Sequence, residues 1–268
     1  MGLRGSGESA TPTAGPAETT IEHQNLGPEI GAVYDNLKPD GVQVSGIPYT
    51  AAPVPELQGD IALQLTRDIV KKAAPLSKAG QAEFVAKLVK DGLPTPASVR
   101  EGATNLKKEI LDRVSHCPHG KILLAGYSQG AWVIRVTLDE LKHSPGVDWP
   151  AVSANIKGIG LLADPYNAIY HPSLPEDLKA KSNGVCAAED PVCNNPFTSP
   201  HLDRCFPHLT GLCPHIRYTT DRGPTDKGVP GTGNEMTGVE NVAFHLRLSL
   251  VQLPPGPVPV PSVRPDVR

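Results

Sequence analysis

Residues 122–136 read ILLAGYSQGAWVIRV, and this stretch decides the fold. Ile122–Ala125 is an apolar run typical of a buried strand, and Ala131–Val136 has the pattern of a helix, so the chain must turn sharply between them. Gly126 and Gly130 flank the turn, because glycine leaves room where a strand and the following helix converge. The stretch therefore predicts a strand, a tight turn and a helix, with Ser128 at the apex.

A serine at such an apex is typical of the nucleophile elbow, G-x-S-x-G, of serine hydrolases. The pentapeptide alone is a weak signal in a glycine-rich chain, but the strand before it and the helix after it make it a strong one. Since a serine hydroxyl is a poor nucleophile at neutral pH, Ser128 would need a histidine to accept its proton and a carboxylate to orient that histidine. In elbow-type hydrolases both partners follow the serine, the acid before the histidine. The pattern alone does not choose among the downstream candidates, which are Asp164, Glu189 and Asp190 for the acid and His143, His171, His201, His208, His215 and His245 for the base.

Length and composition are those of one large α/β domain. The chain has 268 residues, of which 39% are hydrophobic, enough to build a core of that size. The 25 basic and 28 acidic residues give a net charge of −3 and form no concentrated basic stretch, which argues against nucleic acid or an anionic membrane as a partner. No apolar run approaches the roughly 18 residues that a membrane span needs. We therefore expect a soluble monomer without stable membrane insertion.

All five cysteines lie in the second half of the chain, and two pairs have spacings that would close loops. Cys186 with Cys193, and Cys205 with Cys213, fall in segments rich in proline and asparagine, where disulfides commonly fasten long loops in an oxidising compartment. This usage predicts a secreted protein. A metal site is disfavoured, because the neighbouring histidines are spaced by seven residues, which fits no common zinc-ligand pattern.

Outside the elbow, strand and helix patterns alternate. Gly41–Pro48 predicts a short strand that ends in a turn, and Ile156–Asp164 predicts a buried strand. Two stretches between residues 58 and 91, and a third over Leu106–Val114, each carry one apolar face at helical spacing. Strands that alternate with helices imply a parallel sheet with helices on both faces. The predicted fold is a three-layer α/β/α sandwich with a central, mostly parallel sheet.

The remaining segments are less regular. Residues 10–30 are rich in Thr, Pro, Ala and Gly and predict a loop, and residues 171–238 show little periodicity. Residues 239–253 fit a helix but also alternate at period two, so their pattern leaves both types open. Residues 254–268 are rich in proline and predict an extended, disordered tail.

Several segments resemble the cutinase family of serine esterases. The stretch from Ala97 to Trp132, which includes the elbow, carries part of the resemblance, and Arg4-Gly5-Ser6-Gly7-Glu8 resembles the family's R-G-[ST]-x-E turn after its first strand. Ile47–Ala51 resembles its V-x-Y-P-A segment. Cys186–Cys193 is similar to its disulfide-closed loop C-x-x-x-D-x-V-C, and His215–Tyr218 matches its H-x-x-Y. These motifs occur in the family's order and span nearly the whole chain.

The resemblance implies roles for particular residues. It implies Ser128 as the nucleophile, His215 as general base and then general acid, and Asp190 as the carboxylate that orients the histidine. It also implies an oxyanion hole formed by the backbone N–H of Gln129 and by Ser6, whose donors would meet charge that appears only in the transition state. No metal or organic cofactor is implied.

The chain departs from the family pattern in the second half of the site. The interval between Asp190 and His215 is longer than usual, because a cysteine-containing segment looks inserted there. That insertion keeps His201 and His208 open as alternative bases. Asp164 also follows a predicted strand and stays open as an alternative acid.

The N-terminal side looks shorter than that of the family. Only three residues precede the turn-like stretch Arg4–Ser9, and no signal peptide is visible. The family's counterpart of Cys117 pairs with a cysteine near the first strand, and residues 1–116 contain none. We therefore expect a truncated first strand in an esterase domain that spans residues 1–253.

The expected function is hydrolysis of a carboxylic ester through an acyl-enzyme on Ser128. The sequence does not name the ester, which could be a cutin-like polyester, a short-chain lipid ester or a cell-wall ester. Two alternatives stay open. The same residues could transfer the acyl group to an alcohol, or the chain could be a non-catalytic, secreted surface-binding protein on a hydrolase scaffold.

Overall fold

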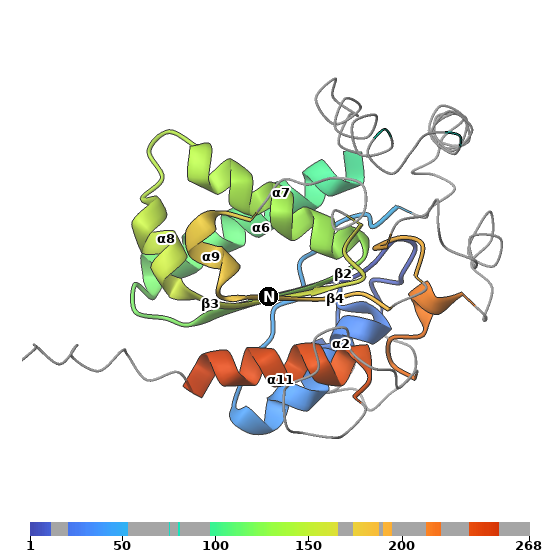
Figure 1. Ribbon diagram of the computed structural model, residues 1–268. Coiled ribbons are helices and arrows are strands. Elements are labelled where there is room, and N and C mark those ends of the chain that lie inside the picture. The colour runs from blue at the N-terminus through green and yellow to red at the C-terminus, as the bar shows by residue number, and fades with distance from the viewer. Residues whose placement is uncertain are drawn as a thin grey trace, which may run out of the picture.

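In the computed structural model, the residues whose structure is described form a central sheet of four parallel strands (Figure 1). Their order in the sheet follows the chain: β1 (Gly2–Leu3), β2 (Ile122–Tyr127), β3 (Ile156–Leu162) and β4 (Ser182–Val185). The structure describes residues 1–11, 21–52, 75, 80, 97–165, 174–187, 190–194, 213–220 and 236–251.

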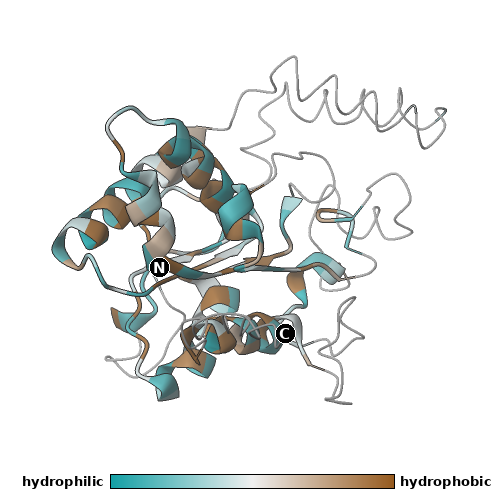
Figure 2. Cartoon of the chain, turned by 60° about the vertical axis from the view of Figure 1, so that its left-hand side comes forward, coloured by the Kyte–Doolittle hydropathy of each residue, from teal (hydrophilic) through white to brown (hydrophobic). Residues whose placement is uncertain are grey.

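Helices cover both faces of this sheet. One face carries α6 (Ala97–His116), α7 (Gln129–His143), α8 (Trp149–Asn155) and α9 (Glu176–Lys179), and the other carries α2 (Gly27–Leu37) and α11 (Gly238–Val251) (Figure 1). Each face has its own cluster of buried hydrophobic side chains. Hydrophobic and hydrophilic residues alternate along the helices in Figure 2, as expected for helices that pack one side against a sheet. The predicted three-layer α/β/α fold with a parallel sheet is confirmed.

The two central strands form because their sequences are apolar on both faces. Every residue of β2 is buried, and in β3 only Lys157 is not. Such continuous runs are what a parallel sheet needs when helices cover both of its faces. Gly160 of β3 lets α11 approach closely, since a Cβ atom there would lie 2.4 Å from Val242. Both strands lie where the sequence predicts them.

The predicted strand over Gly41–Pro48 is wrong. Its only pairing in the described structure is a single parallel bridge between Gly46 and Gly2. The Gly2 N–H donates to Ser45 O, and Gly2 O accepts from Ile47 N, each at 3.0 Å. Pro48 then has no N–H to continue a ladder, so the contact stops after one residue.

The predicted loop over residues 10–30 is also wrong in part, because α2 begins at Gly27. The signal for this helix was present in the sequence. Ile30, Val33, Tyr34 and Leu37 recur at the spacing of one helical face and are all buried, and Pro28 stands in the first turn, where proline is tolerated. The composition of the residues before it obscured this pattern.

Several other expectations can be compared with the described residues. Leu106–Val114 lies within α6, as predicted, and the ambiguous segment 239–253 is helical as α11. β4 was not predicted, since its sequence Ser-Asn-Gly-Val lacks an apolar run and, within the described part of the chain, β3 is its one partner strand. The two helices expected between residues 58 and 91 and the tail at 254–268 lie outside the described residues.

Candidate active site

The site lies at the edge where β2, β3 and β4 all end. Their last residues, Tyr127, Leu162 and Val185, are aligned across the sheet. Whatever follows each strand therefore emerges at the same edge, which is where parallel α/β sheets commonly hold their ligands. Ser128 follows β2 directly, and the loop from Cys186 follows β4 directly.

Ser128 occupies a strained turn between β2 and α7. Its φ of 49° and ψ of −114° are unusual for a residue with a side chain. The turn is tight, because a Cβ atom at Gly126 would lie 2.6 Å from the carbonyl of Gly130. The Ser128 N–H donates to Leu162 O at 2.8 Å, which ties the turn to the end of β3. This is the geometry that the G-x-S-x-G pattern predicts.

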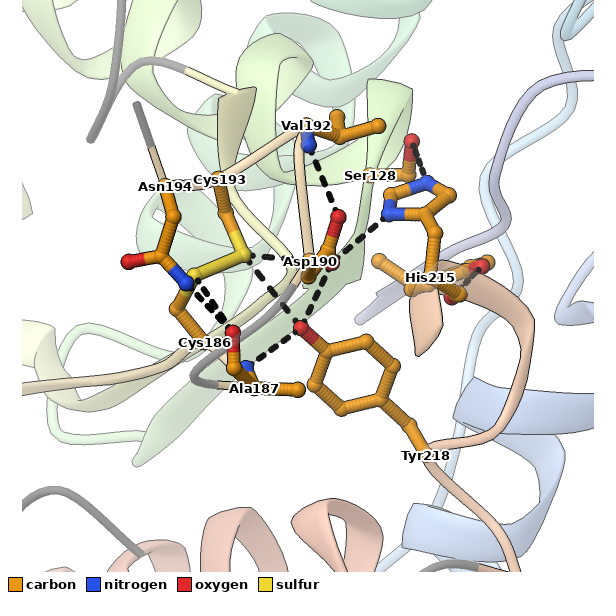
Figure 3. A network of polar contacts seen from close by, with 10 residues as sticks. Ser128, Cys186, Ala187, Asp190, Val192, Cys193, Asn194, His215 and Tyr218 are labelled. Atoms are coloured by element: carbon orange, nitrogen blue, oxygen red, sulfur yellow. Dashed lines mark hydrogen bonds and ion pairs between the residues drawn. A yellow bond between two sulfur atoms is a disulfide. The ribbon is translucent and has the colours of Figure 1, made fainter. Parts of the chain in front are cut away.

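A chain of hydrogen bonds runs from Ser128 through His215 to Asp190 (Figure 3). His215 Nε2 lies 2.9 Å from Ser128 Oγ, and His215 Nδ1 lies 2.9 Å from Asp190 Oδ2. An ionised carboxylate can only accept, so Nδ1 must carry the proton in the neutral ring, and Nε2 is left to accept from the serine hydroxyl. Asp190 is fully buried, and Ser128 and His215 are 7% and 5% exposed. The three residues are thus arranged to withdraw a proton from Ser128 Oγ.

The Asp190 loop is held by covalent and polar contacts. The predicted disulfide between Cys186 and Cys193 is present. Within the loop, the Val192 N–H donates to Asp190 Oδ1 at 2.8 Å, and the Asp190 N–H donates to Ala187 O at 3.0 Å. These bonds fix the backbone on both sides of the carboxylate, so its direction does not depend on a strand or helix.

His215 is held from the sheet by Tyr127, the residue before the nucleophile. The Tyr127 hydroxyl donates to His215 O at 2.6 Å, and the two rings stack with centroids 5.3 Å apart. His215 belongs to η3 (Pro214–Ile216), a single 3₁₀ turn too short to position a side chain by itself. Cys213, directly before it, is disulfide-bonded, while its expected partner Cys205 lies outside the described residues.

Ser6 lies on the loop Arg4–Glu8, next to the elbow. A Cβ atom at Gly5 would lie 2.6 Å from the Tyr127 ring, and one at Gly130 would lie 2.7 Å from Arg4 O, so this loop packs directly on β2 and on the first turn of α7. Gln129 is the first residue of α7, where a backbone N–H has no partner inside the helix. The loop and the helix start therefore lie together at the nucleophile.

Buried polar groups hold this loop in shape. Arg4, which is 3% exposed, donates from Nε to Glu8 O at 3.0 Å, and its guanidinium lies 5.0 Å above the ring of Tyr49. The Tyr49 hydroxyl in turn donates to Arg4 O. Glu8 accepts from the Gly5 N–H. Burial, with a hydrogen bond to Glu29, raises the pKa of the Glu8 carboxyl to about 10, so it is protonated at neutral pH.

The other candidate acids and bases do not join this network or lie outside the described residues. Asp164 is buried and pairs with Arg135 at 2.5 Å. His143 lies at the far end of α7 from Ser128, and His245 lies within α11. Glu189, His171, His201 and His208 lie outside the described residues. Tyr127 and Tyr218, which contact the network, were not singled out by sequence reasoning, although both stand in the motifs quoted for it.

The residues that the structure describes contain no group of three or more His, Cys, Asp or Glu side chains that could hold a metal ion. None of their helices is long and apolar enough to cross a membrane. Cys117 is exposed and forms no disulfide.

A parallel sheet covered by helices on both faces, with a serine on a strained turn after a central strand, defines an α/β-hydrolase-like protein. The family model for cutinase matches residues 64–223, and the chain belongs to the cutinase family.

Individual relatives include cutinases and carboxylesterases. The chain is 28% identical to cutinase CUT1 of Coprinopsis cinerea (49% of this chain, 59% of the relative) and 28% identical to carboxylesterase Culp1 of Mycobacterium tuberculosis (36% and 45%). The chain thus spans about half the length of these relatives. A solved structure of Trichoderma reesei cutinase in complex with a phosphonate inhibitor is 16% identical, covers 85% of this chain and 71% of its own, and has a TM-score of 0.42.

Proposed function

We propose that this protein is a carboxylic ester hydrolase that works through an acyl-enzyme on Ser128. The observation that carries the proposal is the unbroken hydrogen-bonded chain from Ser128 Oγ through His215 to Asp190, at 2.9 Å in both steps. Membership of the cutinase family supports the same chemistry. All three residues come from one chain, so we propose that a monomer suffices.

In this mechanism, His215 Nε2 takes the proton from Ser128 Oγ as the oxygen attacks the ester carbonyl carbon. The Asp190 carboxylate holds the ring in place and stabilises the imidazolium that forms. His215 then gives the proton to the leaving alkoxide oxygen, and the ester C–O bond breaks to leave an acyl group on Ser128. Water, deprotonated by His215, releases the acid and restores the serine.

The negative charge on the carbonyl oxygen would be met by the backbone N–H of Gln129 and by Ser6. The start of α7 suits this task, because the N-terminal end of a helix carries partial positive charge. The close packing of the Arg4–Glu8 loop on that helix end supports Ser6 as the second donor. One such donor is typically worth about 3 kcal/mol in the transition state.

The substrate is proposed only by class. Cutin-like polyesters, short-chain lipid esters and cell-wall esters all present a carbonyl that this chemistry could attack. The disulfide between Cys186 and Cys193 supports secretion, because such bonds persist in oxidising compartments.

The test is covalent labelling and turnover. We expect a fluorophosphonate probe to label Ser128, and Ser128→Ala to lower kcat on a short p-nitrophenyl ester by about 10⁴-fold or more with the fold intact. Ser144→Ala, just after the other end of α7, is the matched control and should keep wild-type turnover. Wild-type turnover in Ser128→Ala would overturn the proposal, and failure of the wild-type protein to react with the probe would favour the non-catalytic alternative. An added alcohol that diverts the acyl group from water would instead favour acyl transfer.

A further inference from the structure

The hydroxyl group of Tyr218 touches the carboxylate that orients His215. Tyr218 Oη donates to Asp190 Oδ2 at 2.7 Å, the same oxygen that accepts from His215 Nδ1 (Figure 3). Two donors therefore share one carboxylate oxygen, while the other oxygen accepts from the Val192 N–H. The mechanism above uses only the histidine.

We propose that Tyr218 is a positioning residue that moderates how strongly Asp190 stabilises protonated His215. This inference rests on the proposed function, in which His215 is the base. By donating to Oδ2, the hydroxyl disperses part of the carboxylate charge and also fixes the direction in which that oxygen faces the imidazole ring.

The direction of the hydroxyl proton follows from a second bond. The Ala187 N–H donates to Tyr218 Oη at 2.8 Å and so occupies one side of the oxygen. The proton is then directed to Asp190. Cys193 Sγ lies 3.3 Å from the same hydroxyl, but a disulfide sulfur is a much weaker acceptor than a carboxylate. Ala187 follows Cys186 directly, so the disulfide helps hold the group that orients Tyr218.

The hydroxyl is a permanent donor. Burial, reinforced by the charge of Asp190, raises the pKa of Tyr218 well above its ordinary value, so the phenol stays protonated wherever an esterase would work. Among the described residues, the other titratable groups on this network are Asp190, His215 and Tyr127, and the carboxyl groups of Glu8 and Glu29 act on Tyr127 from the neighbouring loop and from α2. Burial raises the pKa of Tyr127 as well, so that group is also neutral. Any change in the pH profile caused by removing the Tyr218 hydroxyl would then reflect Asp190 and His215.

Removing the hydroxyl has a directional consequence. Without the second donor, the Oδ2 charge is less dispersed and favours the protonated imidazole more strongly. His215 would then lose its proton at higher pH. Because His215 can act as a base only when its ring is neutral, the enzyme would become active at higher pH.

The experiment is Tyr218→Phe, which removes one oxygen atom. We expect the acidic limb of the kcat/KM profile on a p-nitrophenyl ester to move to higher pH by about 0.5 to 1 pH unit, with kcat on the plateau lower by about 10-fold and KM nearly unchanged. Tyr34→Phe is the matched control, because Tyr34 is also buried but lies in α2, on the opposite face of the sheet from α7. Tyr34→Phe should leave the acidic limb of the kcat/KM profile at its wild-type pH.

A second readout does not need turnover. The imidazole resonances of His215, followed by NMR across the same pH range in the Ser128→Ala background, should show the same upward movement when Tyr218→Phe is added. An unmoved or lowered midpoint in a folded variant would overturn the proposal and reduce Tyr218 to a packing residue. Failure of the proposed function would show itself separately, as wild-type activity in Ser128→Ala.

Discussion

Gly130→Ala tests whether the loop that carries Ser6 must lie against the first turn of α7. Gly130 stands two residues after the nucleophile, and its φ is ordinary, so alanine is compatible with the local backbone. A Cβ atom there would lie 2.3 Å from Leu3 O and 2.7 Å from Arg4 O. Both neighbours are backbone atoms that cannot rotate away, so the substitution must separate the helix start from the loop.

The size of this separation can be worked out from the contact. Contacts below 3.0 Å are essentially absent for real Cβ atoms, so Leu3 O and the new methyl group must move apart by at least about 0.7 Å. That displacement separates the start of the helix that carries Gln129 from the chain that leads to Ser6, and a misplacement of about 1 Å at an active site can cost about 10²-fold in rate. Overpacking of this kind costs about 1–3 kcal/mol of stability.

We therefore expect Gly130→Ala to lower kcat on a short p-nitrophenyl ester by about 10- to 100-fold while most of the protein remains folded. Turnover and the thermal midpoint would be measured on the same preparation. Gly184→Ala in β4 is the control, because a Cβ atom there would meet no atom of the described residues within 4 Å, and it should change neither quantity. Wild-type kcat in a folded Gly130→Ala variant would refute the idea that this contact sets the site.

Two further predictions concern the groups that support the site. Since burial and the neighbouring Glu29 raise the pKa of the Glu8 carboxyl to about 10 in the folded chain, while the unfolded chain releases this proton near 4.5, the stability of the wild type should fall as the pH rises between these values. Glu8→Gln should flatten this slope in urea unfolding at about pH 6 and about pH 9, and parallel slopes in both proteins would contradict the assignment. Replacing Cys186 and Cys193 together by serine should remove about 2–3 kcal/mol of loop closure, and it should lower kcat by a larger proportion than it lowers the thermal midpoint, because the loop that carries Asp190 is loosened first. Unchanged turnover in that variant would mean that the loop holds Asp190 by its hydrogen bonds alone.

The sequence predicts the fold best where one local pattern carries the whole signal. β2, the elbow and α7 are contiguous, so their apolar periods and the two glycines specify them together. α2 carried an equally good helical period from Ile30 to Leu37 but followed a segment whose composition indicated a loop. β4 could not be found in this way, because a short polar strand is specified by its pairing with β3 and not by its own residues.

The candidate site was predictable only as a set of separate motifs. The resemblance to cutinases named Ser128, Asp190 and His215, and the structure brings their polar atoms within hydrogen-bond distance. The contacts of Tyr127 with His215 and of Tyr218 with Asp190 join residues 88 and 28 positions apart in the chain. No periodicity or spacing encodes such contacts, which require the fold itself.

The anchoring of residues 213–220 has a consequence for how such a protein can vary. This short segment is fastened at Cys213 by a disulfide, at His215 by Tyr127 and at Tyr218 by the Asp190 loop. With contacts at both ends and in the middle of this segment, the position of the base does not depend on the length of the sequence that leads to it or away from it. The residues on either side of the segment can therefore vary in number and identity while His215 keeps its place beside Ser128.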